Sequence, residues 1–183
     1  MQPAVVERAQ QGDPDAFEIL VREVGGRLAA VAFRILRDVP AAEDAVQQTL
    51  VTAWRELPGL RDPEHLEAWL YRILVRACAA EERRFGRWRA RVRDVSPDAP
   101  AATNALGRVA DRDELERGFR RLTPDQRAVI VLRYWRDLPQ EEIARTLDIP
   151  LGTVKSRLHH ATTALRAALE AEARPVVIEE GLA

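Results

Sequence analysis

Apolar residues recur at steps of three and four along most of the chain, which is the spacing of one face of an α-helix. Three such stripes lie in the N-terminal half, at residues 17–36, 46–57 and from 66 toward 84. Asp13-Pro14 and Asp62-Pro63 precede two of them, and each pair joins an N-cap carboxylate to a proline suited to the first helical turn. Pro40 is expected to begin the remaining helix. No segment alternates with a period of two, so we expect no strands.

Residues 95–110 interrupt this periodicity with two Pro, a Gly, Ser, Thr and Asn and no large apolar stripe, and we interpret them as a flexible linker. Beyond them, Thr123 and Gln126 fit a capping box at the start of another helix. Apolar surface there is expected from Val129, Ile130, Leu132 and Tyr134.

A short helix from Pro139 to Leu147, a turn over residues 148–152 and a helix capped by Thr153 follow. The predicted fold is therefore all-α: two small helical domains joined by a flexible linker, the second containing a helix-turn-helix over residues 139–170. The expected division is 1–94 for the first domain, 95–110 for the linker, 111–173 for the second domain and 174–183 for a frayed tail.

Composition narrows the class of protein. Of 183 residues, 46% are hydrophobic and 31% charged, which is typical of a globular protein, and the net charge of −1 argues against a strong free-standing nucleic-acid binder. The single cysteine, Cys78, excludes an internal disulfide framework and a multi-cysteine zinc site, and we expect it in the core. No stretch approaches the ~18 apolar residues of a membrane span. We expect a cytoplasmic protein without metal or cofactor.

Charge is distributed in a way that favours DNA binding by the helix-turn-helix. From Ile149 through Leu169 there is no acidic residue, and Lys155, Arg157 and two histidines lie in the same stretch. The second helix would enter the major groove with its N-terminal side chains on base edges. An ordinary helical hairpin with a solvated basic face remains the alternative.

Longer motifs carry a resemblance to a known family. LTPDQRAVIVLRYWRDLPQEEIARTLDIPLGTVKSRLHHATTALRAAL, residues 122–169, closely resembles the C-terminal DNA-binding domain of bacterial σ factors of the extracytoplasmic-function (ECF) group, in the σ70 family. AEDAVQQTLVTAW (residues 42–54) resembles the helix by which these proteins bind core RNA polymerase, and WLYRI (69–73) with ERR (82–84) resembles the adjoining promoter-melting helix. The resemblance covers roughly residues 10–85 and 112–170, in the family's order.

The resemblance implies an alternative σ factor that binds core RNA polymerase and directs promoter-specific transcription initiation. It assigns core binding to Asp44, Gln47 and Gln48. It assigns the −10 element to Leu60, Arg61, Trp69, Arg72, Arg76, Arg83 and Arg84, with a flipped base held by the loop before the promoter-melting helix. Trp69 also lies on an apolar stripe, and the arginines from 83 to 93 also suit a solvated helix face.

For the −35 element, the resemblance assigns base reading to Lys155, Ser156 and His159, and phosphate contacts to Thr153 and Arg157. It also implies an anti-σ partner. The chain departs from the family pattern in several places: Leu74-Val75-Arg76 replaces Ala-Arg-Asn, Ala80 replaces an Asp, His160 replaces a basic residue and Thr162 an Arg. The identity of the recognised bases stays open.

The sequence argues against two other classes of function. A two-domain regulator with a sensing or dimerising N-terminal domain would share the helix-turn-helix, but residues 1–93 lack the βα alternation of a receiver domain. An enzyme acting on nucleic acid would need carboxylates or histidines spaced to hold a metal, and no such cluster stands out. We therefore predict that the chain is not an enzyme.

Overall fold

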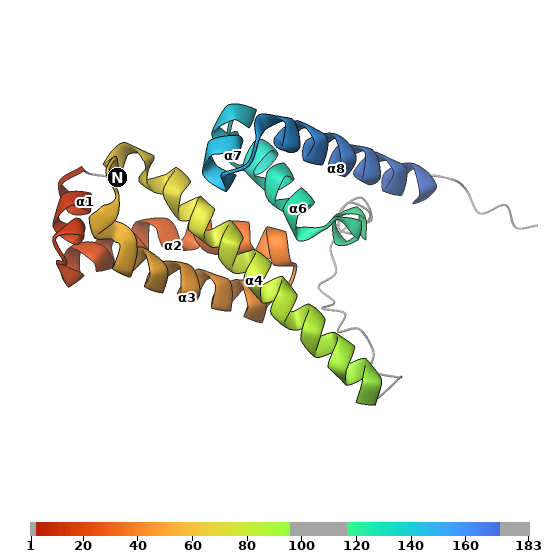
Figure 1. Cartoon of the computed structure of the whole chain (residues 1–183), viewed down its shortest axis with the longest axis horizontal. Helices are drawn as coiled ribbons and strands as arrows, with labels where there is room; N and C mark the ends of the chain where they lie inside the picture. The colour runs from red at the N-terminus through yellow and green to blue at the C-terminus, as the bar shows by residue number, and fades with distance from the viewer. Residues whose placement is uncertain (1–2, 96–116, 173–183) are drawn as a thin grey trace, which may run out of the picture.

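The computed structural model describes residues 3–95 and 117–172, and the regular structure within these ranges is helical, without a strand (Figure 1). The N-terminal domain contains α1 (Pro3–Gln10), α2 (Pro14–Leu36), α3 (Val39–Glu56) and α4 (Leu66–Val95), with short 3₁₀ turns at Leu57–Gly59 and Pro63–His65. The C-terminal domain contains α6 (Pro124–Ile130), a π-helical turn at Val131–Trp135, α7 (Gln140–Leu147) and α8 (Leu151–Glu172). None of the described helices is long and apolar enough to span a bilayer.

Aspartate caps begin α2 and α3. Asp13 Oδ1 accepts hydrogen bonds from the backbone N–H groups of Asp15 and Ala16, at 3.0 and 3.1 Å, and α2 begins at the next residue as predicted. Asp38 accepts from the N–H of Ala41 at 2.9 Å, so α3 begins at Val39, one residue before the predicted start at Pro40. These caps satisfy donors that the first helical turn leaves without partners.

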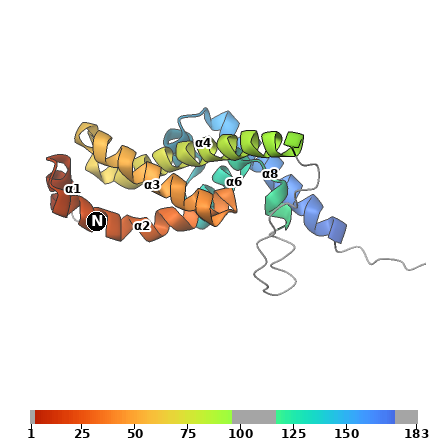
Figure 2. The ribbon, with the colours of Figure 1, turned by 90° about the horizontal axis from the view of Figure 1, so that it is seen from below.

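The apolar stripes of α2 and α4 meet in one core. Leu20, Leu28 and Ile35 of α2 and Leu70 and Leu74 of α4 are at most 2% exposed. Cys78 lies on the same face of α4 and is fully buried, which confirms its predicted place in the core. α4 continues beyond the predicted end near Arg84 to Val95, and Figure 2 shows it extending past α2 and α3.

The predicted capping box starts α6. Gln126 N–H donates to Thr123 Oγ1 at 3.3 Å, and Thr123 N–H donates to Gln126 Oε1 at 2.9 Å. The helix then widens into a π turn, in which Arg136 N–H donates to Val131 O at 3.2 Å. Of the four residues expected to supply apolar surface here, Val129, Ile130 and Leu132 are buried, whereas Tyr134 is 63% exposed.

α7 and α8 form the predicted helix-turn-helix. Asp148 turns the chain in the left-handed region, with φ of 55°. The prediction that Thr153 caps the second helix is wrong, because α8 already begins at Leu151. The carbonyl of Pro150 accepts from the N–H groups of Thr153 and Val154 at 2.9 and 3.2 Å, so Thr153 lies inside the first turn. The predicted linker and tail lie outside the described residues, save Val95 at the end of α4.

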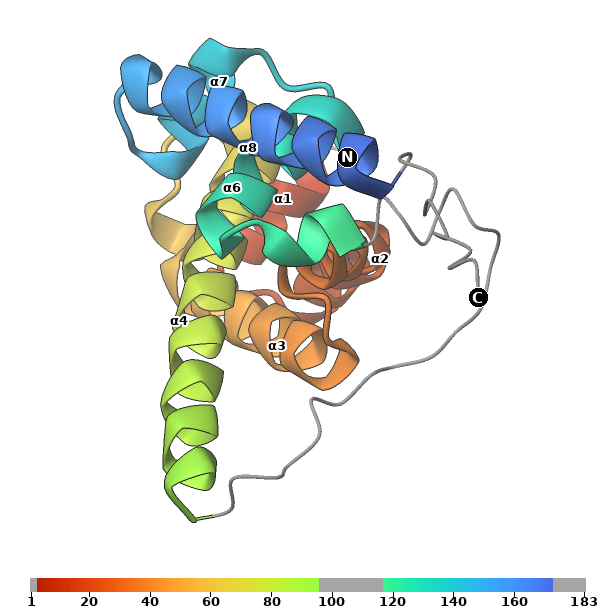
Figure 3. The same ribbon diagram turned by 90° about the vertical axis from the view of Figure 1, so that its right-hand side faces the viewer.

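The C-terminal domain rests on α2 and α4, on the side of the N-terminal domain that faces away from α3 (Figures 1 and 3). α6 packs against α2 and α4, and α7 packs against α4. One cluster of buried apolar side chains runs through both domains. The arrangement leaves α3 uncovered and brings α7 over the first half of α4.

Candidate functional site

The outer face of α3 carries the predicted polymerase-binding residues. Asp44, Gln47 and Gln48 are all exposed. The Arg84 guanidinium donates to Asp44 Oδ2 at 2.8 Å and also pairs with Glu81 at 3.1 Å. Arg84 of α4 therefore holds the Asp44 side chain in place. Gln47 and Gln48 stay at the surface, where they can form hydrogen bonds to a partner protein.

An apolar groove continues this face toward α2. Val51 and Trp54 lie on the apolar stripe of α3, yet their side chains are 40% and 39% exposed. Trp54 packs edge-on against Phe17, with ring centroids 4.9 Å apart, and the groove beside them has a volume of about 510 Å³. Exposed aromatic surface beside polar groups is typical of the centre of a protein interface. The apolar periodicity alone assigned Val51 and Trp54 to the core stripe, and it could not distinguish buried from exposed positions on that stripe.

The loop between α3 and α4 is held by a helix that the sequence pattern did not reveal. Gln10, at the end of α1, donates from Nε2 to the carbonyl of Leu60 at 2.7 Å and to that of Leu57 at 3.3 Å. At the other end of the loop, Asp62 accepts from His65 at 2.8 Å and from the N–H of Glu64 at 3.0 Å, and both bonds lower the pKa of Asp62. α1 also packs against both short turns of this loop, and short-range sequence signals do not encode these long-range contacts.

The loop and α4 together form one wall of a pocket of about 260 Å³. Four of the residues predicted for the −10 element line it: Leu60, Arg61, Trp69 and Arg72. Trp69 is half-buried: it packs against the core and also lines the pocket. Its ring beside the guanidinium groups of Arg61 and Arg72 provides a stacking surface with positive charge, which suits a nucleobase and its phosphate.

The remaining residues predicted for the −10 element lie elsewhere. Arg76 is exposed on α4, one turn beyond Arg72, and its guanidinium lies 3.5 Å from Asp148 of the C-terminal domain. Arg83 is exposed, and Arg84 points to Asp44 on the polymerase-binding side. The further arginines of that run lie on α4, but their side chains are outside the described part: Arg87, Arg89, Arg91 and Arg93.

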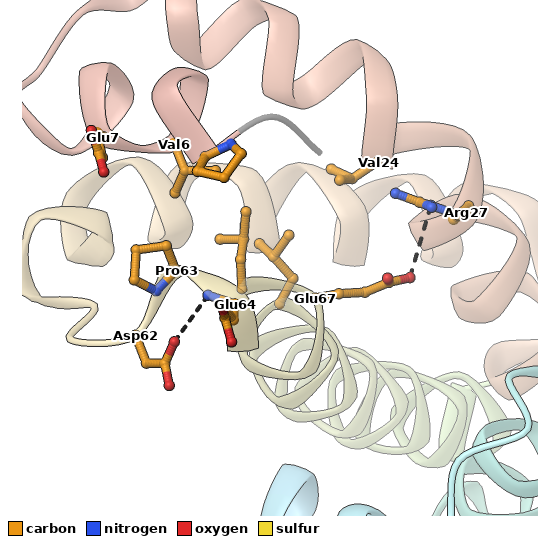
Figure 4. Close-up of a pocket in the computed structure, with 11 residues that line it drawn as sticks. Val6, Glu7, Val24, Arg27, Asp62, Pro63, Glu64 and Glu67 are labelled. Carbon is orange, nitrogen blue, oxygen red and sulfur yellow. Dashed lines mark hydrogen bonds and ion pairs between the residues drawn. The ribbon is translucent and has the colours of Figure 1, made fainter.

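A larger cavity on the other side of the loop has the wrong charge for DNA. It has a volume of about 530 Å³ and lies between α1, α2 and the start of α4 (Figure 4). Glu7, Asp62, Glu64 and Glu67 line it, against the single cation Arg27, which lies 3.9 Å from Glu67. Carboxylates repel phosphate. The smaller pocket, with Arg61, Arg72 and Arg145 against Asp62 and Glu142, is therefore the better candidate for the DNA strand.

The start of α8 presents the residues predicted for the −35 element. Lys155, Ser156 and His159 are exposed, and the Ser156 hydroxyl donates to the carbonyl of Thr153 at 3.0 Å. Thr153 is half-buried. Arg157 lies on another side of the helix, where it pairs with Asp125 of α6 at 2.6 Å. Its predicted contact with phosphate therefore requires this ion pair to open or to be shared.

Cys78 is expected to be chemically silent in the folded chain. Burial raises the pKa of its thiol to about 12, so at about pH 8 only about one molecule in ten thousand carries the reactive thiolate. We expect Ellman's reagent to leave the folded chain unmodified and to titrate one thiol once guanidinium chloride unfolds it. Reaction of the folded chain at the rate of a free thiol would contradict this burial.

Two parts of the sequence match models of one protein family. Residues 20–89 match the family model described as Sigma-70 region 2, and residues 118–167 match Sigma-70, region 4. The chain is 34% identical to the RNA polymerase sigma-E factor of Streptomyces avermitilis, over 92% of this chain and 95% of that protein. It is also 34% identical to the ECF RNA polymerase sigma factor SigL of Mycobacterium tuberculosis, over 91% of this chain and 96% of that protein.

Among solved structures, the chain is similar to the sigma factor RpoE from Bartonella quintana, determined in complex with the anti-sigma factor NepR. The TM-score is 0.65 at 27% sequence identity, and the match covers 85% of this chain and 98% of that one. In this chain the region 2 match precedes the region 4 match.

Proposed function

The chain belongs to the σ70 family of RNA polymerase σ factors, in the extracytoplasmic-function group, and from this premise we propose which of its surfaces bind polymerase and promoter DNA. As an alternative σ factor it binds core RNA polymerase and directs promoter-specific transcription initiation. The proposal assigns one step of that function to each of three surfaces.

The first surface receives the melted −10 strand, and we name it the promoter-strand face: Leu60, Arg61, Trp69, Arg72 and Arg76. The observation that carries this proposal is the pocket of about 260 Å³ on which four of these residues converge. Unstacking a base costs a few kcal/mol, which stacking on Trp69 and contacts from Arg61 and Arg72 to the adjacent phosphates can offset. Arg83 extends the path of the strand along α4, whereas Arg84 is engaged by Asp44.

The second surface reads the −35 element. Lys155 and Ser156 lie one and a half turns into α8, and His159 follows one turn later on the same exposed side. Lys155 can donate to guanine N7 and O6, and Ser156 and His159 can donate or accept. The start of α8 carries no acidic residue and adds the partial positive charge of a helix N-terminus, which favours a phosphate backbone.

The third surface, the polymerase face, binds core RNA polymerase through Asp44, Gln47 and Gln48 on α3. Val51 and Trp54 extend it with apolar area that a partner can desolvate. Polar groups around an exposed tryptophan form the usual composition of a protein interface. Arg84 positions Asp44 within this face.

Further partners and location follow from the family rather than from single residues. The Bartonella quintana relative forms a complex with an anti-sigma factor, and we propose a corresponding partner for this chain. The domain limits 1–94 and 111–173 correspond in this proposal to the two σ regions. The chain acts in the cytoplasm, where bacterial polymerase is, and contributes binding energy and no catalytic chemistry of its own.

Reconstitution tests the function directly. The purified full chain is mixed with core polymerase from its source bacterium, and size-exclusion chromatography should show the two eluting together. The reconstituted holoenzyme should then transcribe fragmented genomic DNA from a small set of start sites that core polymerase alone does not use. Sequencing of the transcript 5′ ends would give the promoter. A folded chain that neither co-elutes nor adds start sites would contradict the proposal.

A further inference from the structure

The described structure brings the two DNA-binding domains into direct contact. Two elements centred about 25 base pairs apart on a promoter are separated by on the order of 85 Å along straight DNA, at ~3.4 Å per base pair. Here α7 lies against α4, so the face proposed for the −10 element and the helix-turn-helix adjoin each other. The two proposed DNA surfaces cannot reach both elements in this arrangement, and the contact between domains must open before promoter binding.

Arg136, directly after the π turn, forms a partly buried ion pair between the domains. A second pair joins the more buried Arg127 of α6 to Glu82 of α4, at 3.9 Å. The Arg136 guanidinium donates to Glu67 Oε1 of α4 at 2.5 Å, and the Arg136 side chain is 24% exposed. The hydroxyl of Tyr71 donates to the same carboxylate oxygen at 2.9 Å, and Arg136 lies 5.4 Å from the centroid of the Tyr71 ring. The Glu67 carboxylate thus accepts hydrogen bonds from Tyr71 of the N-terminal domain and from Arg136 of the C-terminal domain. Hydrogen bonds to a charged group are stronger than those between neutral groups.

Trp135 forms a second link, to α2. The guanidinium carbon of Arg34 lies 3.3 Å from the centroid of the Trp135 ring, a close cation–π contact between the two domains. Trp135 is nevertheless 54% exposed, so the core does not require it. The π turn places Trp135 and Arg136 next to each other and toward the N-terminal domain, while Tyr134 points to solvent.

These contacts hold α7 over the promoter-strand face. Glu142, Arg145 and Thr146 of α7 form the opposite wall of the pocket that contains Trp69 and Arg72. Further along α4, Arg76 is engaged by Asp148 at 3.5 Å. The polymerase face on α3 lies on the other side of the molecule and stays uncovered (Figures 1 and 3).

The interface also has features that weaken the contact between the two domains. Among the described residues, Arg127 Nε, Arg136 Nε and Thr146 Oγ1 are buried without a hydrogen-bond partner, and all three belong to the side of the C-terminal domain that faces α4. Buried polar atoms without partners weaken a contact, because they lose hydration without compensation. The pair of Arg76 and Asp148 is mostly exposed, with side chains 65% and 73% accessible, and adds little.

We propose that Trp135 and Arg136, bound to Arg34, Glu67 and Tyr71, form an intramolecular clasp that holds the free chain closed, with α7 covering the promoter-strand face and α3 left open to polymerase. The functional meaning of the covered face rests on the function proposed above. The clasp itself is a property of the free chain. It keeps α7 against Trp69 and Arg72 until the domains separate.

A thiol probe in the covered pocket tests the clasp without polymerase or DNA. Ala68 lines the pocket and is half-buried, whereas Ala80 is exposed on the same helix. Ala68→Cys and Ala80→Cys are each introduced into the full chain, and maleimide modification is followed by mass spectrometry. Cys78 is buried and should contribute no signal. In the parent chain, modification at position 68 should be slow and at position 80 fast.

Arg136→Ala or Trp135→Ala should raise the modification rate at position 68 about tenfold, the scale of one cation–π or charged contact, and leave the rate at position 80 unchanged. Tyr134→Ala is the matched control, because this neighbouring aromatic residue is solvent-exposed, and it should behave as the parent. Glu67→Gln weakens the clasp from the N-terminal domain and should also raise the modification rate at position 68. This variant replaces any Trp135 or Arg136 variant whose circular dichroism shows a loss of helix. Equal rates at position 68 in the parent and in the folded clasp variants would overturn the clasp, whatever the face binds.

Discussion

Replacing Asp44 with Arg should remove the chain from core RNA polymerase, with a loss of affinity of at least about 100-fold, or roughly 2.8 kcal/mol. Asp44 lies on an exposed helix face with Glu43 and the neutral Gln47 and Gln48, so the complementary surface is expected to be basic. A new cation facing that surface replaces attraction with repulsion, and like charges across an interface cost several kcal/mol. Size-exclusion co-elution and a binding titration with labelled core measure the loss.

The ion pair with Arg84 requires its own control. Arg84 Nη2 lies 2.8 Å from Asp44 Oδ2, so Asp44→Arg alone brings two cations together within the chain. Arg84→Ala removes the pair but keeps Asp44, and this variant should still bind core. The double variant removes the internal repulsion and should fail to bind. Binding by the double variant at the parent's affinity would exclude Asp44 from the polymerase face.

Helix starts were predictable because their signals are local. Asp13 and Thr123 each satisfy backbone donors two or three residues away, so the sequence contains both partners of the bond. The predicted start of α8 failed for a related reason. Thr153 is a good cap residue by type, but the carbonyl of Pro150 already accepts the N–H of Thr153, and residue type alone does not decide between two neighbouring starts.

The sequence predicted candidate site residues but not how they are arranged in space. Leu60, Arg61, Trp69 and Arg72 were identified by resemblance, and they line one pocket. The support of the loop by Gln10 and the cover of the pocket by Thr146 depend on residues about 50 and more than 70 positions away. Such contacts are set by tertiary packing, which periodicity and capping signals do not encode.

The π turn illustrates the same limit. Residues 129–134 have the apolar composition of a continuous helix, and the sequence groups Tyr134 with Val129, Ile130 and Leu132 as apolar surface. One extra residue in the turn rotates all that follows by roughly 100°, the angle per residue of an α-helix. Tyr134 and Trp135 thereby reach the surface, and Arg136 reaches Glu67. The contact between the two domains thus depends on a local irregularity with no recognised sequence signal.

Replacing Lys155 with Ala should lower transcription from the chain's own promoter about 10- to 100-fold, because a good side-chain contact to a base contributes roughly 1–3 kcal/mol of discrimination. Lys155 is exposed in the second turn of α8, where a recognition helix presents its base-reading side chains. The loss should depend on sequence. Changing the base pair that Lys155 reads should reduce transcription by the parent and leave the variant nearly unaffected.

Arg166→Ala is the matched control for the loss of one positive charge. Arg166 is exposed on the same helix, 11 residues further on, which is about 16 Å along the axis. A cation that contacts only phosphate lowers binding to all sequences alike and reduces its salt dependence, so Arg166→Ala should keep the promoter preference of the parent. Run-off transcription by reconstituted holoenzyme, with each −35 base pair varied in turn, separates the two effects. If Lys155→Ala lowered transcription equally on all templates, Lys155 would be a phosphate contact, and base reading would pass to Ser156 and His159.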